Sequence, residues 1–96
     1  MTTTSVPDVI IGVYTHKDVH AAVAINNLGA RLAAATFPAN RAGYQALEAW
    51  ATALGPIQTI GIEGTGSCGA GLSRFLREQG HVVLEVNRPN RQLRHQ

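Results

Sequence analysis

Cysteine, long hydrophobic runs and negative charge are all scarce in this 96-residue chain. The single cysteine, Cys68, excludes an internal disulfide, so a reducing compartment is expected. No apolar run approaches the roughly 20 residues that a membrane-spanning helix requires. Residues 1–8 lack the basic and then apolar pattern of an export signal, and we expect them to form a loose lead-in. The sequence therefore predicts a cytoplasmic protein without a membrane segment.

Acidic residues number only six, against eight lysines and arginines, which gives a net charge of +2. Five of the eight cations lie between Arg74 and Arg94. A hydrophobic content of 45% with 15% charged residues is typical of a globular chain and excludes a disordered one. We expect one small domain over residues 9–87, followed by a basic tail over residues 88–96.

Apolar segments separated by turn residues predict three strands, followed by a helix, a strand, a helix and a strand. The strands are expected at residues 9–13, 19–25, 30–37, 57–62 and 82–86. The unbroken apolar run of the first is typical of a central strand covered on both faces. Asn40 is the expected N-cap of the first helix. The residues expected to face the core are Tyr44, Leu47, Ala51 and Leu54 on the first helix, and Leu72, Phe75, Leu76 and Gln79 on the second.

This β-β-β-α-β-α-β order is that of the ribonuclease-H-like fold, an α/β fold with a five-stranded mixed sheet. Two hairpins form an antiparallel half, and the helical crossovers make the fourth and fifth strands parallel to the first. The fourth strand then lies beside the first, so Tyr14 and Glu63 would be neighbours at one sheet edge. Sites in open α/β sheets form outside the carboxyl ends of the strands. We therefore expect a functional site around these two residues.

Glu63 and Tyr14 differ in what they can do at such a site. Phosphodiester cleavage on this type of sheet uses Mg²⁺ ions that several carboxylates hold. Glu63 suits that role, but Tyr14 stands where a second acid is expected, and its neutral phenol is a poor Mg²⁺ ligand. Glu63 could instead interact with the N-terminus of the following helix, where negative charge is favoured. Spacing alone does not separate these interpretations.

A dinucleotide site is the main alternative for the same region. Residues 64–69, GTGSCG, match the G-x-G-x-x-G pattern, follow an expected strand and open an expected helix. Glu85 ends the next strand about 20 residues later, as the fingerprint requires. Against this interpretation, three strands and a helix precede the motif, and Glu63 would repel a pyrophosphate.

Several other polar or aromatic residues have less specific expected roles. His16 and His20 flank the predicted first turn, so an exposed or turn role is expected for both. Asp18 suits turn chemistry. Cys68 is expected to be a small helix residue, and Trp50 a packing residue.

Basic and small residues near the expected site are candidates for nucleic-acid contacts. The arginines Arg88, Arg91 and Arg94 are spaced by three and could contact phosphates, unless they belong to a solvated terminus. Lys17 lies in the turn after Tyr14. The full set of candidate contacts is Lys17, Gly64, Thr65, Gly66, Arg88, Arg91 and Arg94.

Three segments, IGVYTHKD at 11–18, GIEGTGSCG at 61–69 and EVNRP at 85–89, resemble the N-terminal domain of DEDD-type insertion-sequence transposases. That family includes pilin-segment invertases and RNA-guided bridge recombinases. The resemblance covers the chain from about Val9 to Arg91. It implies a RuvC-like fold, DNA transposition, a Mg²⁺ site built from four acids, and DNA, with a guide RNA in some members, as partner. In the family, a serine nucleophile comes from a separate C-terminal domain. An intact transposase or a second copy of this chain is a further expected partner.

The resemblance assigns Glu63 to the glutamate of the four acids and Tyr14 to the position of the first aspartate. The last two aspartates follow the Asn-Arg-Pro motif in the family, and this sequence ends before them. Cys68 stands where the family often has tyrosine. We therefore expect a truncated, catalytically inactive domain that holds no Mg²⁺ stably, because a lone carboxylate binds that ion weakly. The alternative is a non-catalytic module that binds nucleic acid or inhibits an intact transposase.

Overall fold

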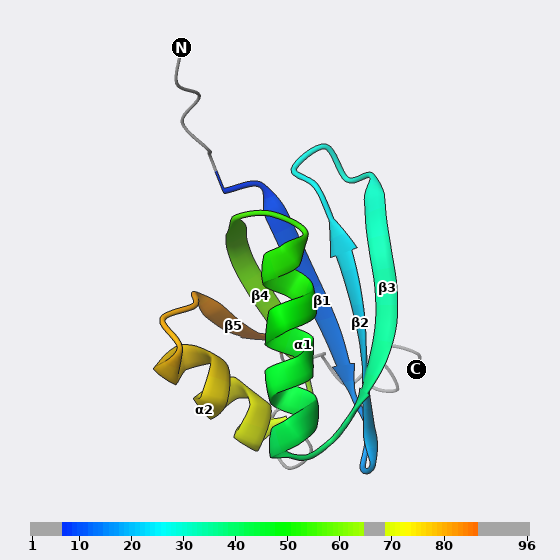
Figure 1. Ribbon diagram of the computed structural model, residues 1–96, viewed down its shortest axis with the longest axis vertical. Coiled ribbons are helices and arrows are strands. Elements are labelled where there is room, and N and C mark those ends of the chain that lie inside the picture. Colours follow the sequence, from blue (N-terminus) through cyan, green and yellow to red (C-terminus); the bar gives the residue numbers. More distant parts are fainter. Residues whose placement is uncertain (1–6, 65–68, 87–96) are drawn as a thin grey trace, which may run out of the picture.

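The computed structural model describes residues 7–64 and 69–86, which form five strands and two helices (Figure 1). In chain order the elements are β1 (Val9–Thr15), β2 (Val19–Ile25), β3 (Arg31–Pro38), α1 (Arg41–Ala53), β4 (Ile57–Glu63), α2 (Ala70–Glu78) and β5 (Val83–Val86). The predicted order is confirmed, and each strand end lies within two residues of its predicted position. Neither helix in the described part of the chain is long and apolar enough to cross a membrane.

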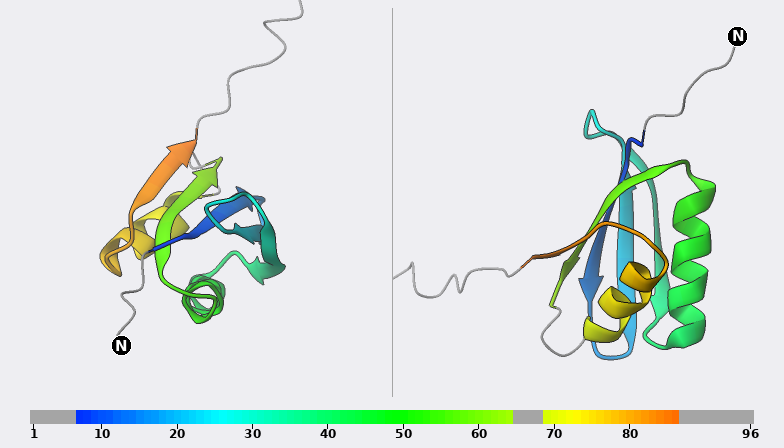
Figure 2. Two further views of the ribbon diagram at one scale, coloured as in Figure 1. Left: turned by 90° about the horizontal axis from the view of Figure 1, so that it is seen from above. Right: turned by 90° about the vertical axis from the view of Figure 1, so that its left-hand side faces the viewer.

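The five strands form one mixed sheet in the order β3-β2-β1-β4-β5. The β1–β2 and β2–β3 pairs are antiparallel, whereas the β1–β4 and β4–β5 pairs are parallel. This confirms the ribonuclease-H-like arrangement. The two crossover connections, β3-α1-β4 and β4-α2-β5, both advance toward the β5 edge of the sheet. Right-handed crossovers that advance in the same direction place their helices on the same face. Figure 2 shows α1 and α2 together on one side of the sheet.

The hydrophobic core lies between that face and the two helices. Ile11 and Val13 of β1 and Ile60 and Ile62 of β4 are buried there. The helices contribute Leu47, Ala51, Leu72 and Leu76. On the opposite face, Ile10 and Gly12 are only half-buried, and no described helix covers them. The expectation that β1 is covered on both faces is therefore wrong for the described residues.

The predicted helix cap and the predicted core residues of the two helices can be compared with the structure. Asn40 caps α1, and its Oδ1 accepts a hydrogen bond from the Gly43 N–H at 2.9 Å, as predicted. The core positions predicted for α1 are confirmed: Leu47 and Ala51 are buried, and Tyr44 and the C-cap residue Leu54 are partly buried against the core. On α2, Gln79 is exposed because the helix ends at Glu78, and Ser73 is buried instead.

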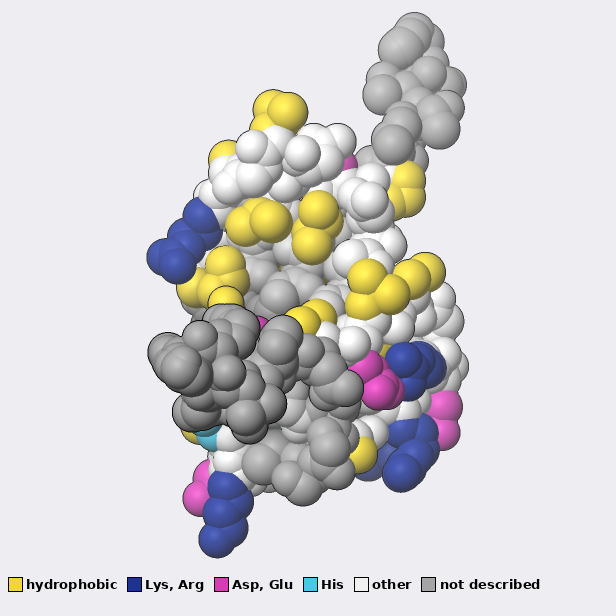
Figure 3. Space-filling view, turned by 180° about the vertical axis from the view of Figure 1, so that it is seen from behind, with side chains coloured by type: hydrophobic (Ala, Val, Ile, Leu, Met, Phe, Trp, Pro, Cys, Tyr) yellow, Lys and Arg dark blue, Asp and Glu magenta, His cyan; other side chains and the backbone are white. Residues whose placement is uncertain are grey.

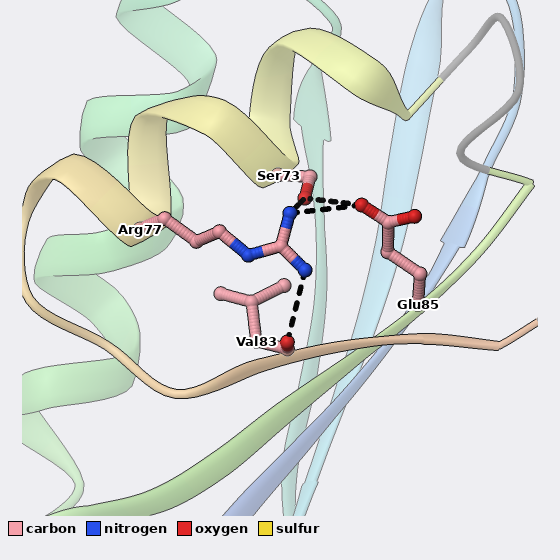
Figure 4. Close-up of polar contacts among 4 residues, drawn as sticks. All are labelled: Ser73, Arg77, Val83 and Glu85. Atoms are coloured by element: carbon pink, nitrogen blue, oxygen red, sulfur yellow. Dashed lines mark hydrogen bonds and ion pairs between the residues drawn. The ribbon is translucent and has the colours of Figure 1, made fainter.

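Arg77 connects α2 to the short strand β5 (Figure 4). Its Nη1 donates to Glu85 Oε2 at 2.8 Å and to Ser73 Oγ at 2.9 Å. Its Nη2 donates to the Val83 carbonyl oxygen at 3.1 Å. The two charged side chains are about half exposed, so solvent screens the ion pair and its contribution to stability is small. The hydrogen bonds of the Arg77 guanidinium group mainly orient β5, which has only four residues.

His20 contradicts the prediction of an exposed or turn role, whereas His16 is exposed as expected. The turn is confined to residues 16–18, so His20 is the second residue of β2 and points toward the helices. Its ring stacks on Tyr44, with centroids 6.0 Å apart and planes 7° apart. Neither ring nitrogen has a hydrogen-bond partner in the described part of the chain. Burial lowers the pKa of His20 below its usual 6.5, because the interior disfavours the charged form.

Acidification should therefore destabilise the fold through His20. The unfolded chain binds a proton at this residue near pH 6.5, whereas the folded chain does so only at lower pH, so stability is lost as the pH falls through this range. In His20→Phe, the free energy of unfolding should be about 1 kcal/mol higher at neutral pH, because a buried unpaired polar group is removed. Its decrease between about pH 7.5 and about pH 5 should also be smaller. Urea unfolding measures both effects. The exposed, non-titrating Gln45→Ala serves as control, and equal pH dependence in wild type and His20→Phe would contradict the assignment.

Candidate functional site

Tyr14 and Glu63 lie side by side at the carboxyl ends of β1 and β4. They are register partners in the parallel pair, so their backbones are about 4.8 Å apart and their side chains share one face. Tyr14 is 48% exposed. The predicted juxtaposition of these residues is thus confirmed, while their roles stay predictions.

An open depression of about 490 Å³ surrounds the two strand ends. Its lining residues are Tyr14, Thr15, His16, Glu63 and Gly64. A smaller trough of about 240 Å³ extends from Tyr14 and Glu63 along the helix-free face. Figure 3 views the molecule from the side opposite to that of Figure 1, away from the helices. Gly12 and Gly61 are register partners in this trough. Among the described residues, a Cβ at Gly12 would meet no atom within 4 Å, whereas one at Gly61 would lie 3.7 Å from the Val86 side chain. The missing side chains leave the floor of the trough to backbone atoms.

Thr15 fixes the turn that follows Glu63. Its Oγ1 is 2.6 Å from the Glu63 carbonyl oxygen and 3.2 Å from that of Gly64, so one hydroxyl proton is shared between them. Gly64 has φ +81°, and a Cβ there would collide with Thr15 Oγ1. Sequence analysis did not identify Thr15 as a site residue. The sequence signal that could have identified it is its position: Thr15 follows Tyr14, just as Gly64 follows Glu63, so the predicted pairing of the two strands brings Thr15 close to Gly64.

The residues at the strand ends do not fit a Mg²⁺ site. In the ranges 7–64 and 69–86, no group of three or more histidine, cysteine, aspartate or glutamate side chains converges on a point. Glu63 offers one carboxylate, and its partner Tyr14 offers a phenol, whereas Mg²⁺ prefers several carboxylate or phosphate oxygens. Glu63 is not the N-cap residue of α2, because that helix begins at Ala70 and Gly69 is its N-cap.

The dinucleotide alternative gains no support from the geometry. In that fingerprint, the helix starts within the glycine motif and its free N–H groups hold the pyrophosphate. Here α2 begins only after the third glycine, and the Gly69 N–H donates to the Gly64 carbonyl oxygen at 3.0 Å. Glu85, the expected ribose ligand, interacts with Arg77.

The other candidate residues are placed as follows. Lys17 and Asp18 are exposed in the β1–β2 turn, where the Asp18 carbonyl oxygen accepts from the Ala39 N–H at 3.0 Å. Trp50 packs against Phe37 with ring centroids 5.5 Å apart, which confirms its packing role. The remaining candidates lie outside the described residues and stay predictions: Thr65, Gly66, Cys68, Arg88, Arg91 and Arg94.

Comparison with known proteins gives a family and a fold. The family model for DEDD transposases of the IS110 type, described as Transposase, matches residues 11–95. No curated protein matches the chain. Among solved structures, the chain is similar to Pelota from Archaeoglobus fulgidus, with a TM-score of 0.62 at 10% sequence identity. The crystal structure of that protein is described as revealing inter-domain structural plasticity. The match covers 88% of this chain and 28% of that one, and at this identity it shows the fold alone.

The contact between Thr15 and Gly64 can be tested with a double-mutant cycle. Thr15→Ala should lower the free energy of unfolding by about 1 kcal/mol, because it removes a hydroxyl donor. Gly64→Ala should lower it by about 2 kcal/mol, because alanine disfavours the left-handed conformation and its Cβ meets Oγ1. The double variant should lose less than the sum, since the smaller residue 15 makes room for the new methyl group. Urea unfolding measures the cycle, with the exposed Thr36→Ala as control, and strict additivity would show that the two residues do not interact.

Proposed function

Because the chain belongs to the IS110-type DEDD transposase family, whose model matches residues 11–95, we propose that it acts in DNA transposition as an N-terminal, RuvC-like domain that binds nucleic acid. One observation carries the proposal: Tyr14 and Glu63 lie together at the carboxyl ends of the two central parallel strands. Open α/β sheets bind their ligands at this place.

We further propose that this site binds nucleic acid without cleaving it. The family is generally metal-dependent, and a metal in such a site would polarise the phosphate and activate the attacking oxygen. The phenol of Tyr14 carries no charge at neutral pH and cannot replace a carboxylate as ligand. Glu63 alone would leave most of the ion's ligand positions to water. The residues of this chain therefore contribute binding and positioning rather than chemistry.

The surroundings of the strand ends suit a phosphate backbone. Lys17 is exposed in the turn that follows β1 and supplies a positive charge close to the site. Val86, the last residue of β5, is the register partner of Glu63. In sequence, Val86 comes directly before the basic segment that contains Arg88, Arg91 and Arg94. A domain that occupies DNA ends without cutting them would compete with an intact transposase, which makes inhibition a second candidate function.

The chain should bind duplex DNA with an affinity that falls as salt rises, because its cations displace counterions from the phosphates. Fluorescence anisotropy with a labelled duplex of about 30 base pairs, between about 50 and 300 mM NaCl, measures the slope. Lys17→Gln should lower that slope by about one unit.

Arg31→Gln is the matched control, since Arg31 is exposed at the opposite end of the sheet, beside Ile25 of β2. Salt-independent binding, or no binding at the lowest salt, would contradict the proposed function. If Lys17→Gln and Arg31→Gln lowered the salt slope equally, the contact with DNA would not be specific to the strand ends.

A carboxylate at position 14 should improve metal binding. Tyr14→Asp places two acids on register partners, and we expect roughly a tenfold increase in Mg²⁺ affinity over wild type, because the ion gains a second charged ligand. Isothermal titration calorimetry with MgCl₂ measures the affinity. Tyr14→Asn has the same size without the charge and should bind no better than wild type. If Tyr14→Asp and Tyr14→Asn bind Mg²⁺ equally, position 14 does not belong to a metal site.

A further inference from the structure

Strand β3 is an edge of the sheet whose outer side no described element covers. It pairs with β2 only, and it is the longest strand, with eight residues. Figure 1 shows it as the outermost strand on the side away from β5. An edge strand presents a row of unpaired N–H and C=O groups, which another strand can bind. The chemistry of this surface therefore specifies a β-strand as partner.

The hydrogen-bond pattern identifies which residues of β3 point their backbone groups outward. The Ala39 N–H donates to the Asp18 carbonyl oxygen, and in antiparallel pairs hydrogen-bonded positions recur every second residue. Residues 33, 35 and 37 are therefore bonded to β2, whose partners in register are residues 24, 22 and 20. The backbone groups of Ala34 and Thr36, which lie between these bonded positions, therefore point away from the sheet. Pro38 has no N–H and ends the usable segment.

The features that commonly protect an edge are missing from the middle of β3. Natural proteins place charges, prolines or bulges on exposed edge strands. Between Leu32 and Phe37 there is no charged residue and no proline. The register irregularity between β2 and β3 lies at the Arg31 end, where Leu32 has no register partner on β2, and residues 33–37 are regularly paired.

Helix α1 leaves room beside this edge. Trp50 of α1 packs on Phe37 of β3. Ala46 and Ala53 lie four residues before and three residues after Trp50, so they neighbour it on the helix surface, and both are exposed. On another side of α1, Glu48 pairs with His81. The part of α1 beside β3 therefore carries uncharged side chains, with alanines on both sides of Trp50.

We propose that β3 pairs antiparallel with β3 of a second copy, with Ala34 on the two-fold axis. In this register Ala34 faces its own copy and Thr36 faces Leu32, and the two Ala34 residues form a hydrogen-bonded pair on the axis. The two sheets then continue as one. A two-fold axis brings identical residues together, so a charge near it would repel itself, and β3 has none there. Arg31 meets Phe37 of the other copy and remains far from its own counterpart.

Sedimentation equilibrium of the full chain, from about 5 to about 500 µM, tests the proposal. Because a strand-pairing interface is small, the dimer should be weak, and its fraction should rise with protein concentration. Ala34→Lys and Ala34→Glu should each weaken it at least about tenfold, because like charges face each other across the axis. An equimolar mixture of the two should recover a dimer at low salt, since lysine then faces glutamate. Circular dichroism checks folding, which should be unaffected because Ala34 is exposed.

Leu84→Lys is the matched control, because Leu84 is an exposed residue on β5, at the opposite edge of the sheet, and its substitution should leave the dimer intact. The proposal is overturned if the wild-type chain stays monomeric over the whole range. It is equally overturned if Ala34→Lys dimerises as well as wild type, or if the lysine and glutamate variants fail to associate with each other. DNA binding is measured separately, so failure here does not affect the proposed function.

Discussion

The parallel pairing of β1 with β4 is the interaction on which both the core and the candidate site depend. It places Ile11 opposite Ile60 under the helices and, three residues later, Tyr14 opposite Glu63 at the strand ends. A shift of one residue would turn the apolar side chains of a strand to the other face. The burial of the isoleucines thus sets the register, and the register determines which polar residues meet. Thr15 then reaches the turn at Gly64 from the neighbouring strand.

The direction of the two crossovers explains the asymmetry of the molecule. Both helices lie on one face because right-handed connections toward the same edge cannot divide them between the faces. The other face is left with the trough between Gly12 and Gly61, and the β3 edge is left without a neighbour in the described part of the chain. Proposed contacts with nucleic acid and with a second copy thus lie on surfaces that the topology leaves open, at different places on the sheet.

The tyrosine at position 14 is compatible with the fold because that position contributes little to the core. Its side chain is about half exposed, whereas its neighbour Val13 is buried beneath the helices. Replacing an acid there would remove a metal ligand without removing packing. A substitution at position 14 can therefore leave the arrangement of the strand ends intact.

Apolar runs and turn residues in the sequence determined the strands, the Asn40 cap and the meeting of Tyr14 with Glu63, because these follow from local periodicity and chain order. The burial of His20 and the role of Thr15 were decided by the tertiary structure. His20 lies in a strand whose bounds were predicted correctly, but which alternate set of β2 side chains faces the helices is set by the pairing of β2 with its neighbours and by the helix packing. Thr15 acts through a carbonyl oxygen 48 residues away, a contact that exists only once β1 and β4 pair.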